Sequence, residues 1–493
     1  SYLGAIGYNN NVFFQSGVAL GQDNKDSGYA SIAGGIGNII KAGVESSSSF
    51  GSNNKINEGA SNMAIGESNM IKSGRSSVAA GYFNVIDSSN FSNVLGANNN
   101  ILNGNSHIAA GENNTIKAGN VNSIFGRNNY ANGSYLTALG KDNNVFYLSA
   151  VALGQGNKDS GYASLAAGIN NTIQADVLYS NTIGYNNRVN GGSSNMAMGE
   201  QNIINTGRGN TSSGYNNTIA ANFSSVFGTS NEVHAGNSHT SGGENNTIRS
   251  GNSNSIFGQN NIADGSYLGT IGYSNSVYYQ GAVALGQGNK DSGYASITGG
   301  LNNIIENNIQ YSTSFGYNNL ATKNPSLPVA TSGSGTFSAG INNVNKGYGS
   351  IALGGNNRPT NVYSLSANYN TIANSHAMSA FGHFNDTIVA IQGASFEPGE
   401  MLFSIGNGLN NLNRRNSFTM LRNGFTSINT TSEMGPNTPR AELDVKGTGA
   451  IIVPVGTTAE RPASPVVGMI RFCTDCPGGP VLQGYDGSGW VNL

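Results

Sequence analysis

The chain has 493 residues, of which 10% are charged and 37% hydrophobic. It is too long for one ordinary globular core and too poor in charge for an ordinary surface, so we expect an extended or modular protein. A formal charge of −2 attracts neither phosphate backbones nor anionic lipids, which excludes nucleic acid and membrane surfaces as expected partners. No apolar run reaches the roughly 18 residues of a membrane helix. Two cysteines can form at most one disulfide within the chain, which is too few to stabilise a chain of this length, so its stability must come from packing.

A glycine that ends a short apolar run recurs every 14 to 16 residues over most of the chain. Each unit, such as Ser77 to Ile86 (SVAAGYFNVI), has two short apolar segments separated by a Gly/Asn turn. That length suffices for two short strands and two tight turns, which predicts one coil of a parallel β-solenoid. About 25 coils spaced by roughly 4.8 Å would form a rod on the order of 120 Å long. The recurring glycines include Gly7, Gly21, Gly35, Gly51, Gly66, Gly81, Gly96, Gly111, Gly126 and Gly140, then continue to Gly316, with Gly340, Gly354 and Gly382 as later members.

Paired asparagines mark many of the turns. Gly and Asn enter left-handed backbone conformations at low steric cost, which explains their abundance between the apolar segments. Stacking the coils would also place the asparagine amides in ladders along the rod. The pairs include Asn53–Asn54, Asn113–Asn114, Asn186–Asn187, Asn216–Asn217 and Asn245–Asn246.

A longer repeat lies over the first. Ser1 to Ser31 recurs at Ser134 to Ser164 and at Ser266 to Ser296, a displacement of 132 or 133 residues, or nine coils. Each copy carries an aromatic pair and a Lys-Asp pair, and flat rings beside polar groups are suited to stacking on sugars. The alternative is that the rings fill an interface between chains and the polar residues form turns. The candidate ligand-binding residues are Phe13, Phe14, Lys25, Asp26, Phe146, Tyr147, Lys158, Asp159, Tyr278, Tyr279, Lys290 and Asp291.

Apolar residues occupy consecutive positions in the expected strands, as in Val18 to Leu20, Val78 to Ala80 and Val283 to Leu285. Consecutive strand residues point to opposite faces, so both faces of these strands are apolar. One face fills the narrow interior of the coil, and the other needs a partner that repeats at the same pitch. A second copy of the chain is the simplest such partner; a lone solenoid with a wider sandwich core is the alternative.

The Ser-x-Ala-x-Gly strand with its Asn-containing turn, repeated over Ser1 to Gly382, resembles the heads of the YadA-type trimeric autotransporter adhesins. The resemblance implies a left-handed parallel β-roll in which three chains pack side by side. The heavy asparagine content and the aromatic insertions depart from that family's pattern. We therefore expect an all-β fold whose β-roll repeats cover residues 1–384, with an interruption near 320–336.

The composition changes after the repeats, since Pro first appears at Pro325 and Asn492 is the only asparagine after Asn437. We expect a β-rich transition or neck at 385–437 and a small β module at 438–493. The segments Gly456 to Pro462, Gly468 to Phe472 and Gly484 to Trp490 resemble, in their order, a C-terminal module of bacteriophage tail fibres. That resemblance implies a virion appendage.

Catalytic chemistry has little support in the sequence. Sugar cleavage needs paired carboxylates, and a solvated turn explains Asp23 with Asp26, or Glu397 with Glu400, as well as catalysis does. Cys473 and Cys476 have zinc-ligand spacing but no second ligand pair, which leaves a disulfide, free thiols or a site shared around a trimer axis open. We expect no enzyme, no cofactor and no metal site.

The sequence thus predicts a trimeric fibre protein of a phage tail or similar virion appendage. Its expected partners are further copies of itself, a host-surface glycan or protein, and other fibre proteins at its ends. The alternatives are a trimeric autotransporter adhesin on a bacterial cell surface and a purely structural spacer.

Overall fold

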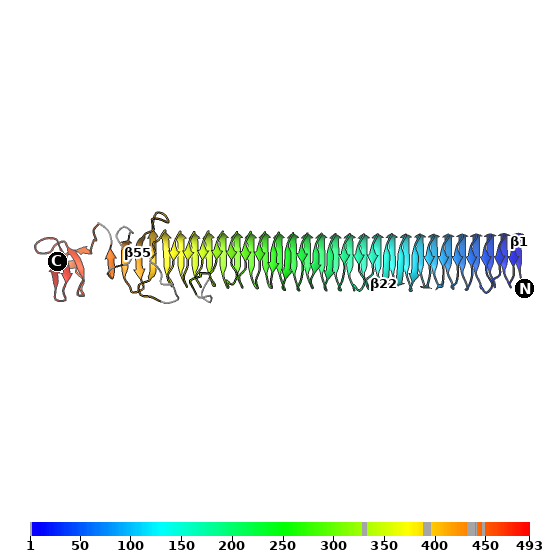
Figure 1. Ribbon diagram of the computed structural model, residues 1–493, viewed down its shortest axis with the longest axis horizontal. Helices are drawn as coiled ribbons and strands as arrows, with labels where there is room; N and C mark the ends of the chain where they lie inside the picture. The colour runs from blue at the N-terminus through cyan, green and yellow to red at the C-terminus, as the bar shows by residue number, and fades with distance from the viewer. Residues whose placement is uncertain (1, 328–332, 388–395, 431–438, 440, 446–448) are drawn as a thin grey trace.

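The protein is a long, straight stack of β-coils with the two chain ends at opposite extremes (Figure 1). The computed structural model describes residues 2–327, 333–387, 396–430, 439, 441–445 and 449–493. Strands make up nearly all of its regular structure, and consecutive coils pair in parallel register. The expectation of an all-β parallel solenoid is confirmed.

Each coil contributes one strand of five residues to a long sheet that runs the length of the rod. This sheet contains 30 strands, and its 26 solenoid strands all pair in parallel. The equivalent glycines lie opposite one another, as in the pairing of Gly7 with Gly21 and of Gly21 with Gly35. The solenoid strands are β1 (Gly4–Tyr8), β3 (Val18–Gln22), β5 (Ile32–Ile36), β7 (Ser48–Ser52), β9 (Met63–Glu67), β11 (Val78–Tyr82), β14 (Asn93–Ala97), β17 (Ile108–Glu112), β19 (Ser123–Arg127), β21 (Thr137–Lys141), β23 (Val151–Gln155), β25 (Leu165–Ile169), β27 (Asn181–Tyr185), β29 (Met196–Glu200), β31 (Thr211–Tyr215), β33 (Ser225–Thr229), β35 (Thr240–Glu244), β37 (Ser255–Gln259), β39 (Gly269–Tyr273), β41 (Val283–Gln287), β43 (Ile297–Leu301), β45 (Thr313–Tyr317), β47 (Phe337–Ile341), β49 (Ile351–Gly355), β51 (Leu365–Tyr369) and β53 (Ser379–His383).

A second sheet is built from shorter strands, each of which begins after two turn residues that follow a long strand. It starts with β2 (Asn11–Val12), β4 (Lys25–Asp26) and β6 (Ile39–Ile40) and continues in parallel register to β48 (Val344–Asn345). The second residue of the long strand and the second of the short strand face each other inside the coil. Ala64 and Ile71 are fully buried in this way, and most coils repeat the pairing of a small with a branched side chain. This narrow double column is the core of the rod.

The glycine at the fourth position of the long strand is required by the closeness of successive coils. Gly154 has φ of +109°, and a Cβ built on it would lie 2.1 Å from the carbonyl oxygen of Gly168 in the next coil. No side chain fits there, which explains the period that the sequence shows. Of each asparagine pair the first residue is left-handed, with φ of 54° at Asn113 and 57° at Asn53, as predicted.

The second asparagine of each pair builds a buried amide ladder, which confirms the other half of that prediction. Asn143 donates from Nδ2 to Oδ1 of Asn129 at 3.0 Å and to the carbonyl oxygens of Leu139 and Gly154 at 3.2 and 2.8 Å. Its own Oδ1 accepts from the backbone and side-chain nitrogens of Asn157. The ladder runs through successive coils from Asn10 to Asn357 and satisfies backbone carbonyls that face the interior.

The predicted interruption near 320–336 leaves the stacking of the long sheet intact, because β45 pairs directly with β47 across it. The long sheet also continues past the expected boundary at residue 384. β53 pairs in parallel with β54 (Met401–Asn407), after which β55 (Asn416–Leu421) and β56 (Thr426–Thr430) run antiparallel and β57 (Leu443–Val445) pairs in parallel with β56. The expected module boundary at Thr438 lies outside the described residues.

The last segment forms a small sheet of its own. Its strands are β58 (Val455–Gly456), β59 (Ile470–Cys473), β60 (Val481–Tyr485) and β61 (Trp490–Asn492), and η3 (Thr458–Glu460) is a short 3₁₀ helix between the first two. β59, β60 and β61 pair in antiparallel order. The chain therefore changes from parallel stacking to local hairpins at its C-terminal end.

Candidate binding surfaces

Part of the predicted super-repeat site assembles on the surface. The Nζ of Lys25 lies 5.4 Å from the ring centre of Phe13, and that of Lys290 lies 5.8 Å from the ring centre of Tyr278. Lys25, Lys158 and Lys290 are exposed because they are the outward residues of their two-residue strands. A cation over an aromatic face is a contact that stabilises both side chains at the surface.

The aspartates of these sites, Asp26, Asp159 and Asp291, lie inside the coil and are fully buried. Asp26 occupies the inward position that Val12 and Ile40 hold in the neighbouring coils. The structure thus corrects the expectation that these three carboxylates meet a ligand, since strand alternation turns each one away from its exposed lysine.

The buried carboxylates close a turn instead. The hydroxyl of Ser31 donates to Oδ1 of Asp26 at 2.5 Å, and the N–H of Gly28 donates to the same oxygen at 3.1 Å. Burial raises the pKa of Asp159 to about 6 and that of Asp291 to about 7, although the serine and glycine donors oppose the shift. The Asp-Ser-Gly-Tyr-Ala-Ser segment common to the three super-repeats is therefore a structural motif of the coil.

The second ring of each aromatic pair is exposed and meets a tyrosine of the next coil. Tyr147 is 66% exposed, and its ring centre lies 6.5 Å from that of Tyr162. Phe14 and Tyr29 are related in the same way at 6.4 Å, as are Tyr279 and Tyr294 at 6.4 Å. Sequence reasoning missed the three partner tyrosines, although each belongs to the Gly-Tyr step of the repeated turn motif.

The first rings are placed differently. Phe146 and Tyr278 are only partly exposed, whereas Phe13, in the first coil, is 60% exposed. Phe146 lies against Tyr130 of the preceding coil, with ring centres 5.6 Å apart. These contacts give the first rings a packing role within the rod, while Phe13 and all three second rings face solvent.

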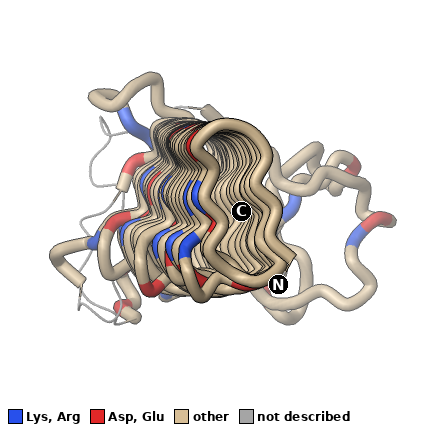
Figure 2. The backbone as a smooth tube through the Cα atoms, turned by 90° about the vertical axis from the view of Figure 1, so that its right-hand side faces the viewer, with Lys and Arg blue, Asp and Glu red and all other residues tan. Residues whose placement is uncertain are grey.

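The outer face of the long sheet presents an uncharged surface along the rod. The first and third residues of each long strand point outward, opposite the buried second residue. None of these residues is charged in any strand from β1 to β53. Leu139 and Ile271, at third positions, are 50% and 55% exposed in the single chain. In the view along the rod, the charged residues of the stacked coils gather on one side and along one edge (Figure 2).

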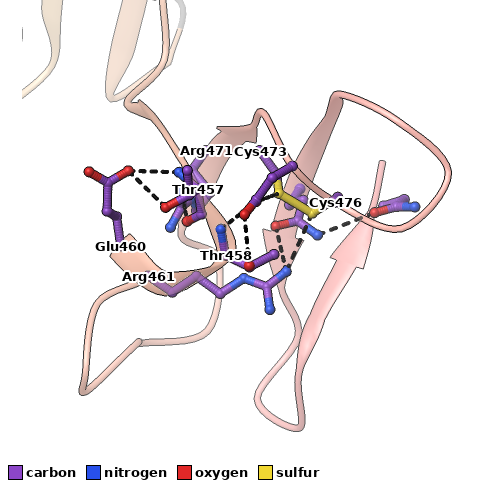
Figure 3. Close-up of a disulfide and its surroundings, with 10 residues drawn as sticks. Thr457, Thr458, Glu460, Arg461, Arg471, Cys473 and Cys476 are labelled. Atoms are coloured by element: carbon purple, nitrogen blue, oxygen red, sulfur yellow. Dashed lines mark hydrogen bonds between the residues drawn. A yellow bond between two sulfur atoms is a disulfide. The ribbon is translucent and has the colours of Figure 1, made fainter.

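The C-terminal sheet carries a small hollow of about 320 Å³, whose lining includes Glu460, Arg471 and Trp490. The Arg471 guanidinium lies 5.7 Å from the centre of the Trp490 ring. Cys473 and Cys476 form a disulfide, which decides among the alternatives that the sequence left open. The bridge lies beside Arg461, whose Nη2 donates to Gln483 Oε1 at 3.0 Å (Figure 3).

The polar clusters have structural partners. His107 and His239 are buried at equivalent positions, where each Nδ1 accepts the backbone N–H of an asparagine one coil further on. Glu400 is buried beside Arg422, with 3.7 Å between carboxylate oxygen and Nε. Within the described ranges, no three His, Cys, Asp or Glu residues lie close enough together to hold a metal ion.

No known family model matches the sequence, and no curated protein compared with it is significantly similar. Over the part of the chain that the structure describes, no helix combines the length and the apolar character needed to cross a bilayer.

Proposed function

We propose that the protein is a non-enzymatic fibre in which three copies of a left-handed roll pack side by side through the outer faces of their long sheets. The observation that carries this proposal is the absence of charge from the outward first and third positions of β1 to β53. Soluble surfaces normally mix both signs of charge over about a quarter to a third of their residues. An uncharged, apolar face of this length is suited to burial against a partner of the same pitch.

The size of the face agrees with a stable interface. The first three residues of each long strand, over 26 coils, span an area of about 1,200 Å² per chain at ordinary strand spacings. Stable protein interfaces bury about 800 Å² per partner. The number three is supported by the resemblance of the repeats to YadA-type heads.

We further propose that the fibre belongs to a phage tail or a similar virion appendage and attaches it to a host surface. The order of motifs in the C-terminal segment, which resembles a tail-fibre module, supports the virion. The stiff, straight rod supports a role in holding weak and repeated contacts at a distance, where multivalency raises the overall affinity. The burial of Asp26 and of Glu400 removes one member of each carboxylate pair that sugar cleavage could have used.

The assembly is tested by light scattering of the full chain, with negative-stain images. We expect a thin rod with the mass of three 50.8 kDa chains. Introducing two glutamates on the outer face, Leu139→Glu with Ile271→Glu, should yield single chains, because buried charges without partners oppose assembly. The matched control, Asn144→Glu with Ser276→Glu, places the same charges on the short strands of the same coils and should stay trimeric. A monomeric unaltered protein would refute the trimer.

Attachment is tested by incubating fluorescent trimer with a panel of intact bacteria. Retention on some strains, reduced in the single-chain variant, is the expected result. A trimer that is retained on no strain would contradict attachment and leave the spacer role.

A further inference from the structure

A second corner of each coil, where the chain turns from the short strand back into the long strand, has one residue with a left-handed backbone. Its φ is 59° at Ser106, 48° at Ala163 and 67° at Gly209. Small residues fill this position in most coils, as expected where a side chain at positive φ is strained.

From the coil of β14 to that of β51, the residue at this corner is an aromatic ring in every third coil. Two coils with other residues always separate one ring from the next. The rings have φ between 50° and 59°, and each is between 57% and 64% exposed. We call this row of seven side chains the ring edge; it consists of Phe91, Tyr135, Tyr179, Phe223, Tyr267, Tyr311 and Tyr363.

The rings are separated by a constant number of coils, even where the number of residues between them changes. The first six rings are 44 residues apart, but Tyr311 and Tyr363 are 52 residues apart because the loop after β46 (Leu320–Ala321) intervenes. The interval is still three coils, with Gly335 and Gly349 at the two positions between them. The three-coil interval is thus kept although the number of residues changes.

Three of the rings, Tyr179, Tyr311 and Tyr363, contact a tyrosine of the preceding coil, with ring centres 5.4 to 5.7 Å apart, but all seven remain largely exposed. More than half of each of these residues is exposed, and Ser, Ala, Gly or, once, Val121 forms the same turn in the intervening coils. A bulky residue at positive φ costs free energy, and such outliers gather at functional sites. The ring edge is therefore better explained by a contact outside the chain.

The surroundings of the rings are polar, and two of the seven rings have an arginine beside them, since the backbone N–H groups of Phe91 and Phe223 donate to the carbonyls of Arg75 and Arg208. Between Phe91 and Tyr135, Asn90 donates to Asn105 at 2.8 Å and Asn105 donates to Asn120 at 3.2 Å, forming an exposed amide ladder. Asn222, Asn237 and Asn252 repeat this arrangement between Phe223 and Tyr267. Amides beside exposed rings match a ligand that offers hydroxyl groups and apolar C–H faces together.

We propose that the ring edge binds an uncharged linear polysaccharide that lies along the rod, with a sugar stacked on each ring. Three coils correspond to about 14 Å, so the polymer would repeat in units of a few sugars. Only a partner with a translational repeat can use seven equivalent contacts at once, and a linear polymer has one; the exposed amides beside the rings favour a sugar polymer over another copy of the rod. This inference rests on the proposed attachment function and names the ligand class that the rod would recognise.

The test compares two variants of the full chain, each lacking five exposed rings. The ring-edge variant has Phe91→Ser, Tyr135→Ser, Tyr179→Ser, Phe223→Ser and Tyr267→Ser. Serine occupies the same corner in Ser106, Ser194 and Ser238, so folding should be preserved. The matched control removes five exposed tyrosines that have no regular spacing, at the ends of long strands: Tyr82→Ser, Tyr185→Ser, Tyr215→Ser, Tyr273→Ser and Tyr317→Ser.

The probes are mannan, dextran and neutral O-polysaccharides released from lipopolysaccharide, each fractionated by length and immobilised for binding measurements. The unaltered trimer should bind at least one polymer, more tightly as its length increases. The ring-edge variant should lose on the order of a hundredfold in affinity, because the multivalent gain disappears. The control variant should bind as the unaltered trimer does.

The results separate this inference from the proposed function. Equal binding by the ring-edge variant and the unaltered trimer would overturn the role of the ring edge. A ring-edge variant with the mass of one chain would overturn it too, because the rings would then join copies of the protein. A trimer that is retained on bacteria but binds none of the polymers would refute the ligand class while attachment stands. Retention on neither would refute both.

Discussion

The solenoid and the C-terminal sheet satisfy their buried polar groups in different ways. In the solenoid each coil depends on its neighbours, because strands, glycines and asparagine amides all bond along the rod. In the C-terminal sheet the contacts are local: a capping box at Thr457 with Glu460, antiparallel hairpins, and a disulfide between residues three apart. Because bonding in the solenoid runs along the rod, a substitution that weakens one coil should also destabilise the neighbouring coils. In the C-terminal sheet, where the bonds are local, the effect should stay near the substituted residue.

Removing one member of the buried amide ladder tests the axial dependence most strongly. Asn143→Ala removes the side chain that joins three coils and leaves the carbonyls of Leu139 and Gly154 without these donors. We expect the free energy of unfolding to fall by about 5 kcal/mol, since each buried group left unsatisfied costs about 1–3 kcal/mol. Denaturant titration followed by circular dichroism measures the change.

The adjacent substitution Asn144→Ala is the control, because Asn144 is exposed on the outer side of β22 (Asn144–Leu148). Its effect should stay within about 0.5 kcal/mol. If both variants were equally stable, the ladder would not be a principal source of stability.

The two regions should respond to pH in opposite directions. The pKa of Asp291 is about 7 in the folded solenoid because of burial, well above its ordinary value of 3.8. The folded state therefore binds the proton more tightly than the unfolded chain, and solenoid stability should fall as pH rises from about 4 to 7. Asp159 acts in the same direction between about pH 4 and 6. Each of these two aspartates should lower the free energy of unfolding by on the order of 3 kcal/mol as the pH rises through its range.

In the C-terminal sheet, hydrogen bonds hold the pKa of Glu460 and of Asp486 below their ordinary values, mainly through the backbone N–H groups of Thr457 and Ser488. That stabilisation is lost as the pH falls through those lowered pKa values. Hydrogen exchange at pH 4 and pH 7, measured separately for the two regions, resolves the opposite slopes. Asp291→Asn should flatten the solenoid profile, and an unchanged profile would exclude Asp291 as its source.

The smallest expected effect is that of the disulfide. Replacing Cys473 and Cys476 by serine frees a loop of four residues, which lowers the stability of the C-terminal sheet by about 2 kcal/mol in the chain-entropy account. Amide hydrogen exchange should become faster in β59 and β60 and stay unchanged in the coils of the solenoid. Faster exchange throughout the solenoid would show that the two regions unfold together.

Much of the solenoid could be predicted because its requirements are local and repeated. The glycine at the fourth strand position and the asparagine pairs have steric reasons that each coil repeats, as Gly154 and Asn143 show. The uncharged outer face was also foreseeable from strand alternation. The extension of the long sheet beyond residue 384 was not, because β54 pairs with β53 across a segment without the repeat motif.

The candidate site was predicted less well. Lys25 and Asp26 look like a solvated charged pair, and only alignment with Val12 and Ile40 shows that Asp26 faces inward. The ring edge was hidden because its members stand in different short contexts, such as Asn-Phe-Ser at Phe91 and Ser-Tyr-Leu at Tyr135. The ring edge becomes visible in the sequence when positions are compared by coil and not by residue number.

The axial bonding of the coils also has a mechanical consequence. Within one chain, a coil touches only the coils before and after it, so a pulling force applied to one end of the chain acts on the terminal coil first. We expect the rod to peel coil by coil under tension, each step releasing about 50 Å of extended chain. A fibre of this kind lengthens under load before it breaks, and it absorbs the work in many small, equal steps.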